Sequence, residues 1–429
     1  MQTQFSLAAL ANPDMAQSEK ILRSCVHCGF CLATCPTYLL TANELDSPRG
    51  RIYLIKDMLE KNASADKRTT YHIDRCLSCL SCMTTCPSSV DYMHLVDHAR
   101  EFIEKTAPRP ISEKFKRDLL SYILPRPKIF RLALQLARLF SPFQAFLPVN
   151  MSSFLRLAPK KLPAPSLVDQ PQIFLAQGAR RMRVALLSGC AQTVLDPKIN
   201  EATIRVLTRF GAEVVIVEGI GCCGAVAHHL GKVDQSHQLA RKNIKAWKRE
   251  IEAAGLDYIV VNASGCGTTI KDYKFLFRDD PEMREGAAEV SERAIDICEI
   301  INKLDYEKSQ EVPKLRVAYH SACSSQHGQK ITHEPYVLLQ RAGFEVMAVP
   351  EGHICCGSAG TYNLLQPDLS QQLLQRKLAN INSLDPHIIA AGNFGCMMHI
   401  GNKSQVPVAH LIELLDWASG GPKPQSLNF

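Results

Sequence analysis

Eight cysteines in the N-terminal part of the chain repeat one spacing twice. The first run is Cys25, Cys28, Cys31 and Cys35, followed by Pro36. The second run is Cys76, Cys79, Cys82 and Cys86, followed by Pro87. Both runs read C-x2-C-x2-C-x3-C-P, in which the evenly spaced triad wraps one loop around a cuboidal cluster and the fourth cysteine reaches a second cluster. The two runs must therefore lie close together in the fold.

This is the spacing of bacterial two-cluster ferredoxins, and it predicts two [4Fe–4S] clusters. We expect the first cluster to be held by Cys25, Cys28, Cys31 and Cys86. We expect the second cluster to be held by Cys76, Cys79, Cys82 and Cys35. The alternative is two zinc sites, which also use four thiolates, but structural zinc usually has two well-separated C-x2-C pairs. Even triads that end in Cys-Pro favour iron–sulfur clusters.

Three other residues lie near the first run and could affect a cluster. His27 lies between two cysteines and is expected to be an ordinary loop residue, because the eight cysteines already fill the ligand positions. Arg49 and Arg51 could lower the negative charge near a cluster, and the alternative for both is a surface ion pair.

The other nine of the 17 cysteines also form a pattern. The first set of four is Cys190, Cys222, Cys223 and Cys266. The second set of four is Cys323, Cys355, Cys356 and Cys396. Only Cys298 is left over, and its context RAIDICEI predicts a buried helical residue that acts as a small hydrophobe. The chain starts without the basic segment of a signal peptide, so we expect a cytoplasmic protein whose thiols stay reduced and bind metal rather than forming disulfides.

The two later sets belong to an internal repeat of the C-terminal half. RVALLSGC matches RVAYHSAC at an offset of 133 residues, and GCCG matches ICCG at the same offset. ASGCG around Cys266 matches NFGCM around Cys396 at an offset of 130. In the first repeat, the β-branched runs RVALLS and EVVIVE flank the helical stretch INEATIRVLTRF. This alternation predicts a small parallel α/β sheet in each CCG repeat.

The predicted fold class is a multidomain α+β protein, with an N-terminal α-helical ferredoxin domain followed by two tandem α/β CCG repeats. We assign the two-cluster domain, a basic connector, the first CCG repeat and the second CCG repeat to residues 1–105, 106–180, 181–310 and 311–429. Helices should surround the cysteine loops. Ser47 and Pro48 should begin one of these helices over PRGRIYLIKDMLE.

The CCG cysteines suggest further metal sites. Adjacent cysteines such as Cys222 and Cys223 rarely form a disulfide without strain. Thiols at the carboxyl ends of parallel strands would converge at one edge of the sheet, where ligands bind in such folds. We therefore expect a third and a fourth site, holding iron–sulfur or zinc, and the alternative is that these cysteines bind nothing. Four histidines near these cysteines are expected to be ordinary polar loop residues for the most part, with metal ligation by one of them as the alternative: His228, His229, His320 and His399.

A dinucleotide-binding motif is formally present in GIGCCG, residues 219–224, which satisfies G-x-G-x-x-G after the strand-like run VVIV. The counterpart in the second repeat, GHICCG, keeps both cysteines but has Ile354 in place of the middle glycine. The feature that the repeats share is the thiol pair. We therefore expect no nucleotide site here.

The connector carries an excess of positive charge. Residues 100–183 contain 16 Lys and Arg against 5 Asp and Glu, a net charge of +11, so the remaining residues sum to −4. Within it, IFRLALQLARLF (129–140) is apolar over most of its circumference and too short to span a bilayer. We expect this helix to pack within the complex, with docking on a membrane surface or partner as the alternative. No aromatic-interleaved basic patch or recognised module indicates nucleic-acid binding.

A resemblance covers nearly the whole chain. CVHCGFCLATCPTY, SPRGRIYLIK, CLSCLSCMTTCPS, GCCGA, SGCG and CCGSAGTY, in this order, resemble the iron–sulfur subunits of bacterial glycolate oxidases. The resemblance implies a peripheral complex on the cytoplasmic face of the inner membrane, in which flavoprotein subunits oxidise glycolate to glyoxylate. FAD would be held only in those partner subunits, and this chain would pass electrons onward, with quinone as the expected acceptor. The CCG half is similar also to heterodisulfide reductases, a subunit of anaerobic glycerol-3-phosphate dehydrogenase and lactate-utilisation proteins.

One departure from the wider CCG family bears on function. That family commonly ends each repeat with C-x-x-C, but here Cys266 is followed by Gly-Thr-Thr and Cys396 by Met-Met-His. The missing thiolate favours an electron-transfer subunit with no catalytic residue of its own and no activity alone. The alternatives are the iron–sulfur subunit of another 2-hydroxy-acid or glycerol-3-phosphate dehydrogenase, a disulfide reductase acting at the CCG site, and a zinc-bound scaffold.

Overall fold

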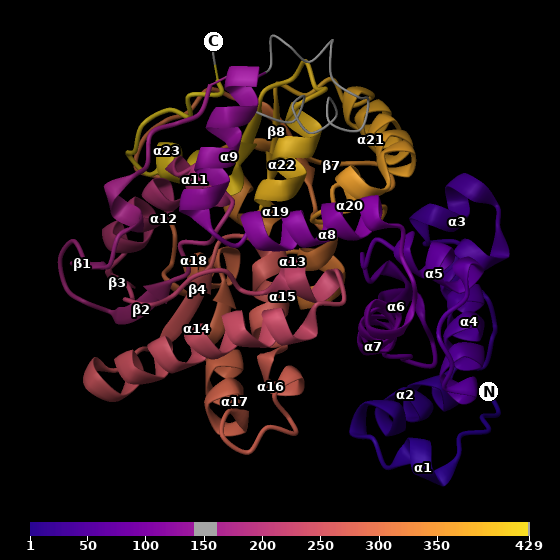
Figure 1. Cartoon of the computed structure of the whole chain (residues 1–429). Helices are drawn as coiled ribbons and strands as arrows, with labels where there is room; N and C mark the ends of the chain where they lie inside the picture. Colours follow the sequence, from indigo (N-terminus) through magenta and orange to yellow (C-terminus); the bar gives the residue numbers. More distant parts are fainter. Residues whose placement is uncertain (141–160, 428–429) are drawn as a thin grey trace.

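The computed structural model describes residues 1–140 and 161–427 (Figure 1). The N-terminal part is helical, as expected around the cysteine loops, and it lies to one side of the α/β part in Figure 1. Its α-helices are α1 (Leu7–Leu10), α2 (Pro13–Ser24), α3 (Pro36–Thr41), α4 (Pro48–Lys61), α5 (Lys67–Asp74), α6 (Ser81–Thr85) and α7 (Tyr92–Thr106). Two 3-10 helices, η1 (Phe30–Leu32) and η2 (Glu44–Asp46), lie between them.

Helix α4 begins where the sequence predicted. The Ser47 hydroxyl accepts a hydrogen bond from the Gly50 N–H at 2.9 Å, and Pro48 is the first helical residue. Gly50 also permits a close approach to the preceding turn, because a Cβ there would lie 2.0 Å from the carbonyl oxygen of Glu44. The helix buries an apolar face that includes Ile55 and Leu59.

The first α/β unit contains a five-stranded sheet. Its strands are β1 (Gln172–Phe174), β2 (Met182–Leu186), β3 (Ala212–Ile216), β4 (Tyr258–Val261) and β5 (Ala294–Asp296). Their order is β1-β3-β2-β4-β5, and all neighbours are parallel except β1 and β3. Its helices are α11 (Gln192–Leu195), α12 (Lys198–Arg209), α13 (Ala225–His229), α14 (Val233–Ala254), α15 (Ser264–Lys271), α16 (Tyr273–Leu276), α17 (Arg284–Arg293) and α18 (Ile297–Lys303). The antiparallel edge strand β1 comes from the connector and was not predicted.

The second α/β unit contains a four-stranded parallel sheet. Its strands are β6 (Arg316–His320), β7 (Glu345–Ala348), β8 (Ile388–Ala391) and β9 (Val408–His410), in the order β7-β6-β8-β9. Its helices are α19 (Glu334–Arg341), α20 (Tyr362–Leu365), α21 (Pro367–Asn382), α22 (Phe394–Gly401) and α23 (Leu411–Ala418), with a short π-helix, η5 (Ser324–Gln329), after β6.

The two units have the same topology, which confirms the predicted pair of parallel α/β repeats. The order β3-β2-β4-β5 in the first corresponds to β7-β6-β8-β9 in the second. Helix α12 of the first unit packs against α23 of the second, and α18 of the first packs against α19 of the second. The two units therefore contact each other through equivalent pairs of helices. One apolar core runs through both units and includes Cys298, which is buried in α18 as expected.

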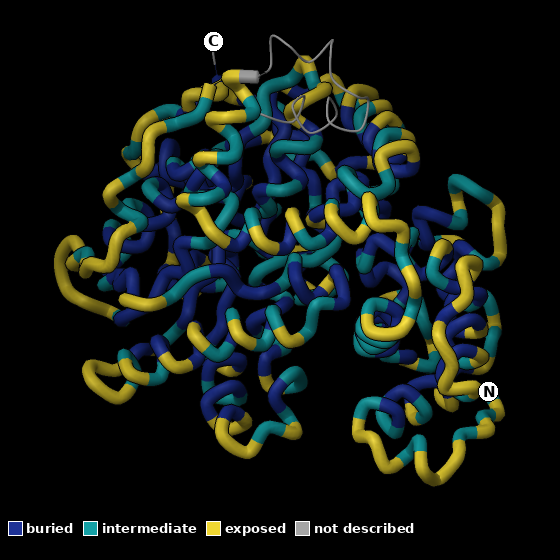
Figure 2. The backbone as a smooth tube through the Cα atoms, in the orientation of Figure 1, coloured by how far each residue is buried: buried dark blue, intermediate teal, exposed yellow. Residues whose placement is uncertain are grey.

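The connector forms two helices on the outside of the molecule, α8 (Ile111–Ile123) and α9 (Pro127–Phe140) (Figures 1 and 2). Helix α9 corresponds to the expected amphipathic helix, but its packing is one-sided. Phe130 is buried, whereas Leu132, Leu136 and Leu139 are exposed and share one face. A 3-10 turn, η4 (Leu167–Asp169), precedes β1.

Candidate metal centres

The two N-terminal cysteine runs form loops with the same backbone turns. His27 and Gly29 in the first loop have φ angles of 55° and 88°, and Ser78 and Leu80 in the second have 50° and 61°. These residues occupy the same positions relative to their cysteines. Left-handed backbone is uncommon for residues other than glycine and persists where the surroundings require it, as at ligand sites. The repeated spacing thus specifies a repeated wrapped loop, and His27 is part of it.

The first triad shares a space with two cysteines of the second run. A small cavity is lined by Cys25, Cys28 and Cys31 of the first run and by Cys82 and Cys86 of the second. Cys25 is buried, and burial raises the pKa of its thiol, which also has Cys86 and Cys28 as charged neighbours. Cys28 is exposed, so this set reaches the surface.

The other four N-terminal cysteines, Cys35, Cys76, Cys79 and Cys82, are all buried. Burial and the neighbouring thiols raise the pKa of Cys79 and Cys82 well above the usual value. Metal binding requires thiolates and displaces these protons. The charged neighbours of Cys82 include its own set and also Cys31 of the first set. Each set offers the four thiols that a [4Fe–4S] cluster takes, and the two sets adjoin.

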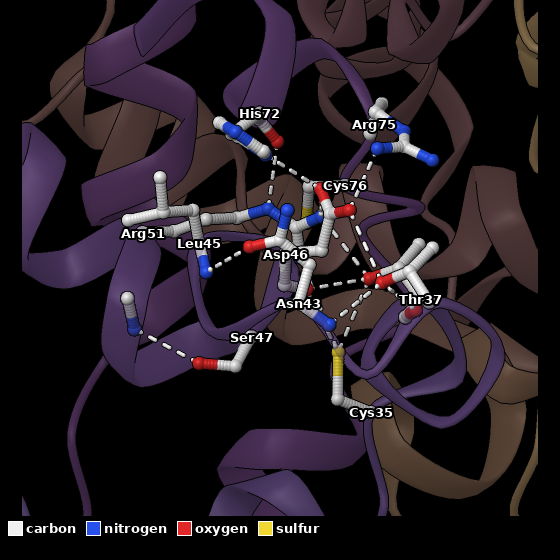
Figure 3. A network of polar contacts seen from close by, with 12 residues as sticks. Cys35, Thr37, Asn43, Leu45, Asp46, Ser47, Arg51, His72, Arg75 and Cys76 are labelled. Atoms are coloured by element: carbon white, nitrogen blue, oxygen red, sulfur yellow. Dashed lines mark hydrogen bonds and ion pairs between the residues drawn. The ribbon is translucent and has the colours of Figure 1, made fainter. Parts of the chain in front are cut away.

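A buried network of ion pairs lies beside Cys35 of the second set (Figure 3). Arg51 is 1% exposed, and its Nη1 lies 4.0 Å from Cys35 Sγ. Asp46, also buried, pairs with Arg51 at 3.5 Å, with His72 at 2.8 Å and with Arg75 at 2.7 Å. Burial disfavours the Arg51 cation, but the nearby thiols and Asp46 raise its pKa above the usual value. A fixed positive charge therefore lies beside Cys35.

The two arginines near the first run have different roles. Arg49 is partly exposed, and its Nε lies 2.8 Å from Glu44 Oε1, which confirms a surface ion pair for this residue. The same interpretation is wrong for Arg51, because helix α5 covers its side chain and supplies His72 as a partner for its Nε, which donates to the His72 carbonyl at 2.7 Å.

The four cysteines of the first CCG site come from the carboxyl ends of β2, β3 and β4, where they were expected to converge. Cys190 follows β2, the pair Cys222 and Cys223 follows β3, and Cys266 lies in α15 after β4. Neighbouring thiols shift one another's pKa values in a series that runs from Cys190 through Cys222 and Cys223 to Cys266. The Tyr273 hydroxyl donates to the Cys223 carbonyl at 2.7 Å and holds this loop.

The second CCG site has the same arrangement and one added donor. Cys323 Sγ lies 3.9 Å from Cys355 Sγ, and the thiols of Cys356 and Cys396 lie within 4.8 Å of each other. His320, the last residue of β6, contributes a ring nitrogen that lies within 4.8 Å of the thiols of Cys356 and Cys396. All three residues of this Cys/His cluster are buried.

The remaining candidate histidines have ordinary polar partners, as expected. His228 and His229 face Asp97 at 3.2 and 3.9 Å, and they join α13 to α7 rather than reaching the thiols. His399 Nε2 lies 3.2 Å from the Ser370 hydroxyl.

The two groups of sites adjoin. Cys79 of the second N-terminal set packs in one buried cluster with Leu77 and Cys355, and Cys323 borders the same cluster. The charge of Cys323 is, after burial, the largest influence that raises the pKa of Cys79. The second CCG site is therefore next to the second N-terminal set.

The GIGCCG loop does not offer its amides to a phosphate. The Gly221 N–H donates to Asn243 Oδ1 at 2.8 Å, and the Gly224 N–H points to Cys222 Sγ at 3.4 Å. The helix that follows, α13, has five residues. A dinucleotide site needs free amides at the start of a helix, and this geometry agrees with the expectation of no nucleotide site.

Sequence reasoning missed three charged groups near the thiols. Asp46 lies beneath the second set, and Arg100 on α7 donates to the Cys76 carbonyl at 2.6 Å. Lys377 is buried beside the second CCG site. Of the three, only Lys377 is marked by a pattern in the sequence, because it interrupts the buried apolar stripe of α21 that residues such as Leu373 and Ile381 form.

Comparison with known proteins agrees with this architecture. Residues 24–90 match the family described as 4Fe-4S dicluster domain, and they contain all eight N-terminal cysteines. Residues 184–271 and 317–401 each match the CCG family, described as Cysteine-rich domain, and they contain the two later sets of four.

Three relatives differ in how much of the chain they cover. The glycolate oxidase iron-sulfur subunit of Escherichia coli (strain K12) is 41% identical over 418 residues, 97% of this chain and 99% of that protein. The probable glycolate oxidase iron-sulfur subunit of Bacillus subtilis (strain 168) is 30% identical over 93% of this chain and 94% of that protein. Lactate utilization protein A of Bacillus subtilis (strain 168) is 28% identical over 55% of this chain and 99% of that protein. Identity along almost its whole length shows that the chain belongs to the family of glycolate oxidase iron–sulfur subunits.

Proposed function

We propose that the chain is the electron-transfer subunit of a complex that oxidises glycolate, and that it receives electrons from flavoprotein subunits. The observation that carries the proposal is the pair of adjoining four-thiol sets built on two loops of one backbone shape. When bound there, [4Fe–4S] clusters accept and release single electrons. The substrate rests on the similarity to the subunit from Escherichia coli.

Each ligand set that we propose takes three cysteines from one run and the fourth from the other run. The first is Cys25, Cys28, Cys31 and Cys86, supported by the cavity that these four line together with Cys82 of the adjoining set. The second is Cys76, Cys79, Cys82 and Cys35, supported by the place of Cys35 among the charged neighbours of Cys79 and Cys82.

Oxidation of the substrate itself belongs to partner subunits. Removing two electrons from a 2-hydroxy acid needs a cofactor that accepts a pair, and a flavin can then release electrons singly. The sequence has no other flavin or nicotinamide fingerprint, and the GIGCCG loop uses its amides internally. We therefore place FAD in flavoprotein partners and expect the chain alone to show no dehydrogenase activity.

A second candidate substrate is lactate, another 2-hydroxy acid. It is favoured by the similarity to Lactate utilization protein A, although that similarity covers only 55% of this chain. Comparing glycolate with lactate in the assembled complex distinguishes the two.

The test compares two cysteine variants in the assembled complex. With Cys79→Ser, glycolate should still reduce the flavin of the partner subunit, while electron delivery to the acceptor is lost. Cys298→Ser is the matched control, because this buried cysteine belongs to none of the four sets. Normal delivery in Cys79→Ser, or glycolate oxidation by the isolated chain, would overturn the proposal.

The acceptor that we propose is a quinone, and a cavity supports it. A space of about 680 Å³ is lined by Cys76 of the second set, Tyr71, Tyr362 and Leu365, and it extends to Lys116 on α8. This volume is typical of small-molecule sites. Leu365→Trp should narrow the cavity and raise the KM for quinone, while reduction of a hydrophilic dye continues. An unchanged KM would contradict this location.

We further propose that the complex attaches peripherally to an anionic membrane surface through α8 and α9. No helix among the described residues is long and apolar enough to cross a membrane. Four apolar side chains, spaced to share one face of α8, are exposed: Ile111, Phe115, Leu119 and Tyr122. Four exposed basic residues lie on these two helices or between them: Lys114, Arg126, Lys128 and Arg138. An apolar face edged by basic residues is typical of helices that lie on anionic lipid.

A further inference from the structure

The two CCG sites differ at a position that the internal repeat makes equivalent. RVALLSGC and RVAYHSAC align Leu187 with His320. Leu187 is buried in an apolar core of the first unit, whereas His320 is buried at the matching strand end in the second unit. Only the second site therefore has a nitrogen donor at this position.

The His320 side chain has no polar partner inside the protein. It is 1% exposed, and neither ring nitrogen has a hydrogen-bond partner among the described residues. A buried polar group without a partner costs about 1–3 kcal/mol. One ring nitrogen nevertheless lies within 4.8 Å of the thiols of Cys356 and Cys396. A metal ion bound by these three groups would satisfy that nitrogen.

A buried cation marks the same site. Lys377 is 1% exposed, makes no ion pair among the described residues, and donates from Nζ to the Glu351 carbonyl at 2.9 Å. In the first repeat the neutral Asn243 donates to the equivalent loop, at the Cys222 carbonyl, at 3.0 Å. A buried cation needs negative charge nearby. Thiolates bound to metal at the second CCG site would supply that charge.

We propose that a ring nitrogen of His320 ligates a metal centre at the second CCG site together with the thiolates of Cys356 and Cys396, and that the first CCG site has no nitrogen ligand. With Cys323 and Cys355 the site offers five donors, one more than the four that a structural zinc ion takes. The expected metal is therefore iron in an iron–sulfur assembly, and imidazole in place of thiolate raises the reduction potential of such a centre.

The inference rests on the proposed function only for its redox meaning, since Cys79 of the second N-terminal set borders this site. The ligand assignment depends on the geometry of His320 and on the buried Lys377 beside the same site. Its test is therefore independent of glycolate oxidation.

The test uses the full chain, isolated without oxygen and labelled with nitrogen-15 in histidine. Pulsed EPR should show a nitrogen coupling on a centre distinct from the two N-terminal clusters, and metal analysis should give more than about eight irons per chain. His320→Leu, which makes the second site resemble the first, should abolish the coupling and remove the additional iron. His399→Leu is the matched control, because His399 lies on α22 of the same repeat and contacts Ser370. It should keep both the coupling and the iron content.

A second variant covers a failure of His320→Leu to fold. His320→Cys supplies a thiolate in place of the imidazole and should retain the iron while losing the nitrogen coupling. The proposal is overturned if the coupling survives either substitution, if the site in the unmodified chain holds zinc, or if no metal beyond the eight N-terminal irons is found. Absence of the two N-terminal cluster signals would instead count against the proposed function, so the two failures are distinguishable.

Discussion

Replacing Arg51 by methionine should lower the reduction potential of the second N-terminal cluster and leave that of the first nearly unchanged. The Arg51 guanidinium is buried, and its Nη1 lies 4.0 Å from Cys35 Sγ. A buried positive charge favours the addition of an electron nearby, and methionine removes the charge while keeping an unbranched chain. The effect should be specific, because the thiols that act most on the Arg51 charge, Cys76 and Cys35, both belong to the second set.

The size of the shift follows from Coulomb's law. Two unit charges 4 Å apart interact by about 4 kcal/mol at an effective dielectric constant of about 20. An electron spread over a cluster lies farther away on average, and about 7 Å gives about 2 kcal/mol, or about 100 mV for one electron. Loss of Arg51 leaves Asp46 with His72 and Arg75 as partners and should destabilise the fold by about 1–3 kcal/mol, so intact cluster content must be verified first.

The assay is a redox titration followed by EPR, with two further variants. Asp46→Asn removes a negative charge from the same network and should shift the potential upward, opposite to Arg51→Met. Arg49→Met is the control, because Arg49 is partly exposed, pairs with Glu44 and borders the first cavity. Solvent screening should keep its shift small. Equal shifts of both clusters in Arg51→Met, or shifts of the same sign in Arg51→Met and Asp46→Asn, would refute the electrostatic reasoning.

Three further outcomes are expected. Cys35→Ser should remove the spectrum of the second N-terminal cluster more than that of the first, and loss confined to the first would contradict cross-ligation. Phe115→Glu should weaken sedimentation with phosphatidylglycerol vesicles several-fold, whereas Tyr53→Glu, an equally exposed control on α4, should not. Although burial lowers the pKa of His94, hydrogen bonds to carboxylates such as Asp272 raise it to about 9. This folded-state pKa exceeds the unfolded value of about 6.5. The stabilisation is therefore complete below about pH 6.5 and lost as pH rises through about 9, and thermal unfolding against pH should become flatter in His94→Gln.

Local chemistry explains why much of the fold and the N-terminal sites could be predicted. The triad spacing fixes where a loop must turn, and the structure has left-handed residues at the same places in both loops, including Ser78 and Leu80. Ser47 and Pro48 specify a helix start through one cap and one fixed φ angle. The repeated strand–helix alternation specified two sheets of one topology.

What could not be predicted depends on contacts between distant segments. Arg51 lies in an ordinary amphipathic helix, and its burial arises because α5 brings His72 and Arg75 over it. Strand β1 has only three residues, and it pairs with β3 through backbone hydrogen bonds that leave little pattern in the side chains. The approach of His320 to two thiols requires β6 to lie beside β8.

The position of each CCG site gives a physical reason for their difference. The main charged neighbours of the first site's thiols are other cysteines of the same site. The second site also has Cys79 as a neighbour, across an apolar contact that excludes water. Low dielectric strengthens interactions between charges, so metal-bound thiolates beside a second group of metal-bound thiolates repel one another strongly. A neutral donor at His320 and a cation at Lys377 both lower the negative charge at that boundary. Among the described residues, the charges that act most on the first site's thiols belong to that site itself, and there Leu187 aligns with His320 and the neutral Asn243 donates to the cysteine loop.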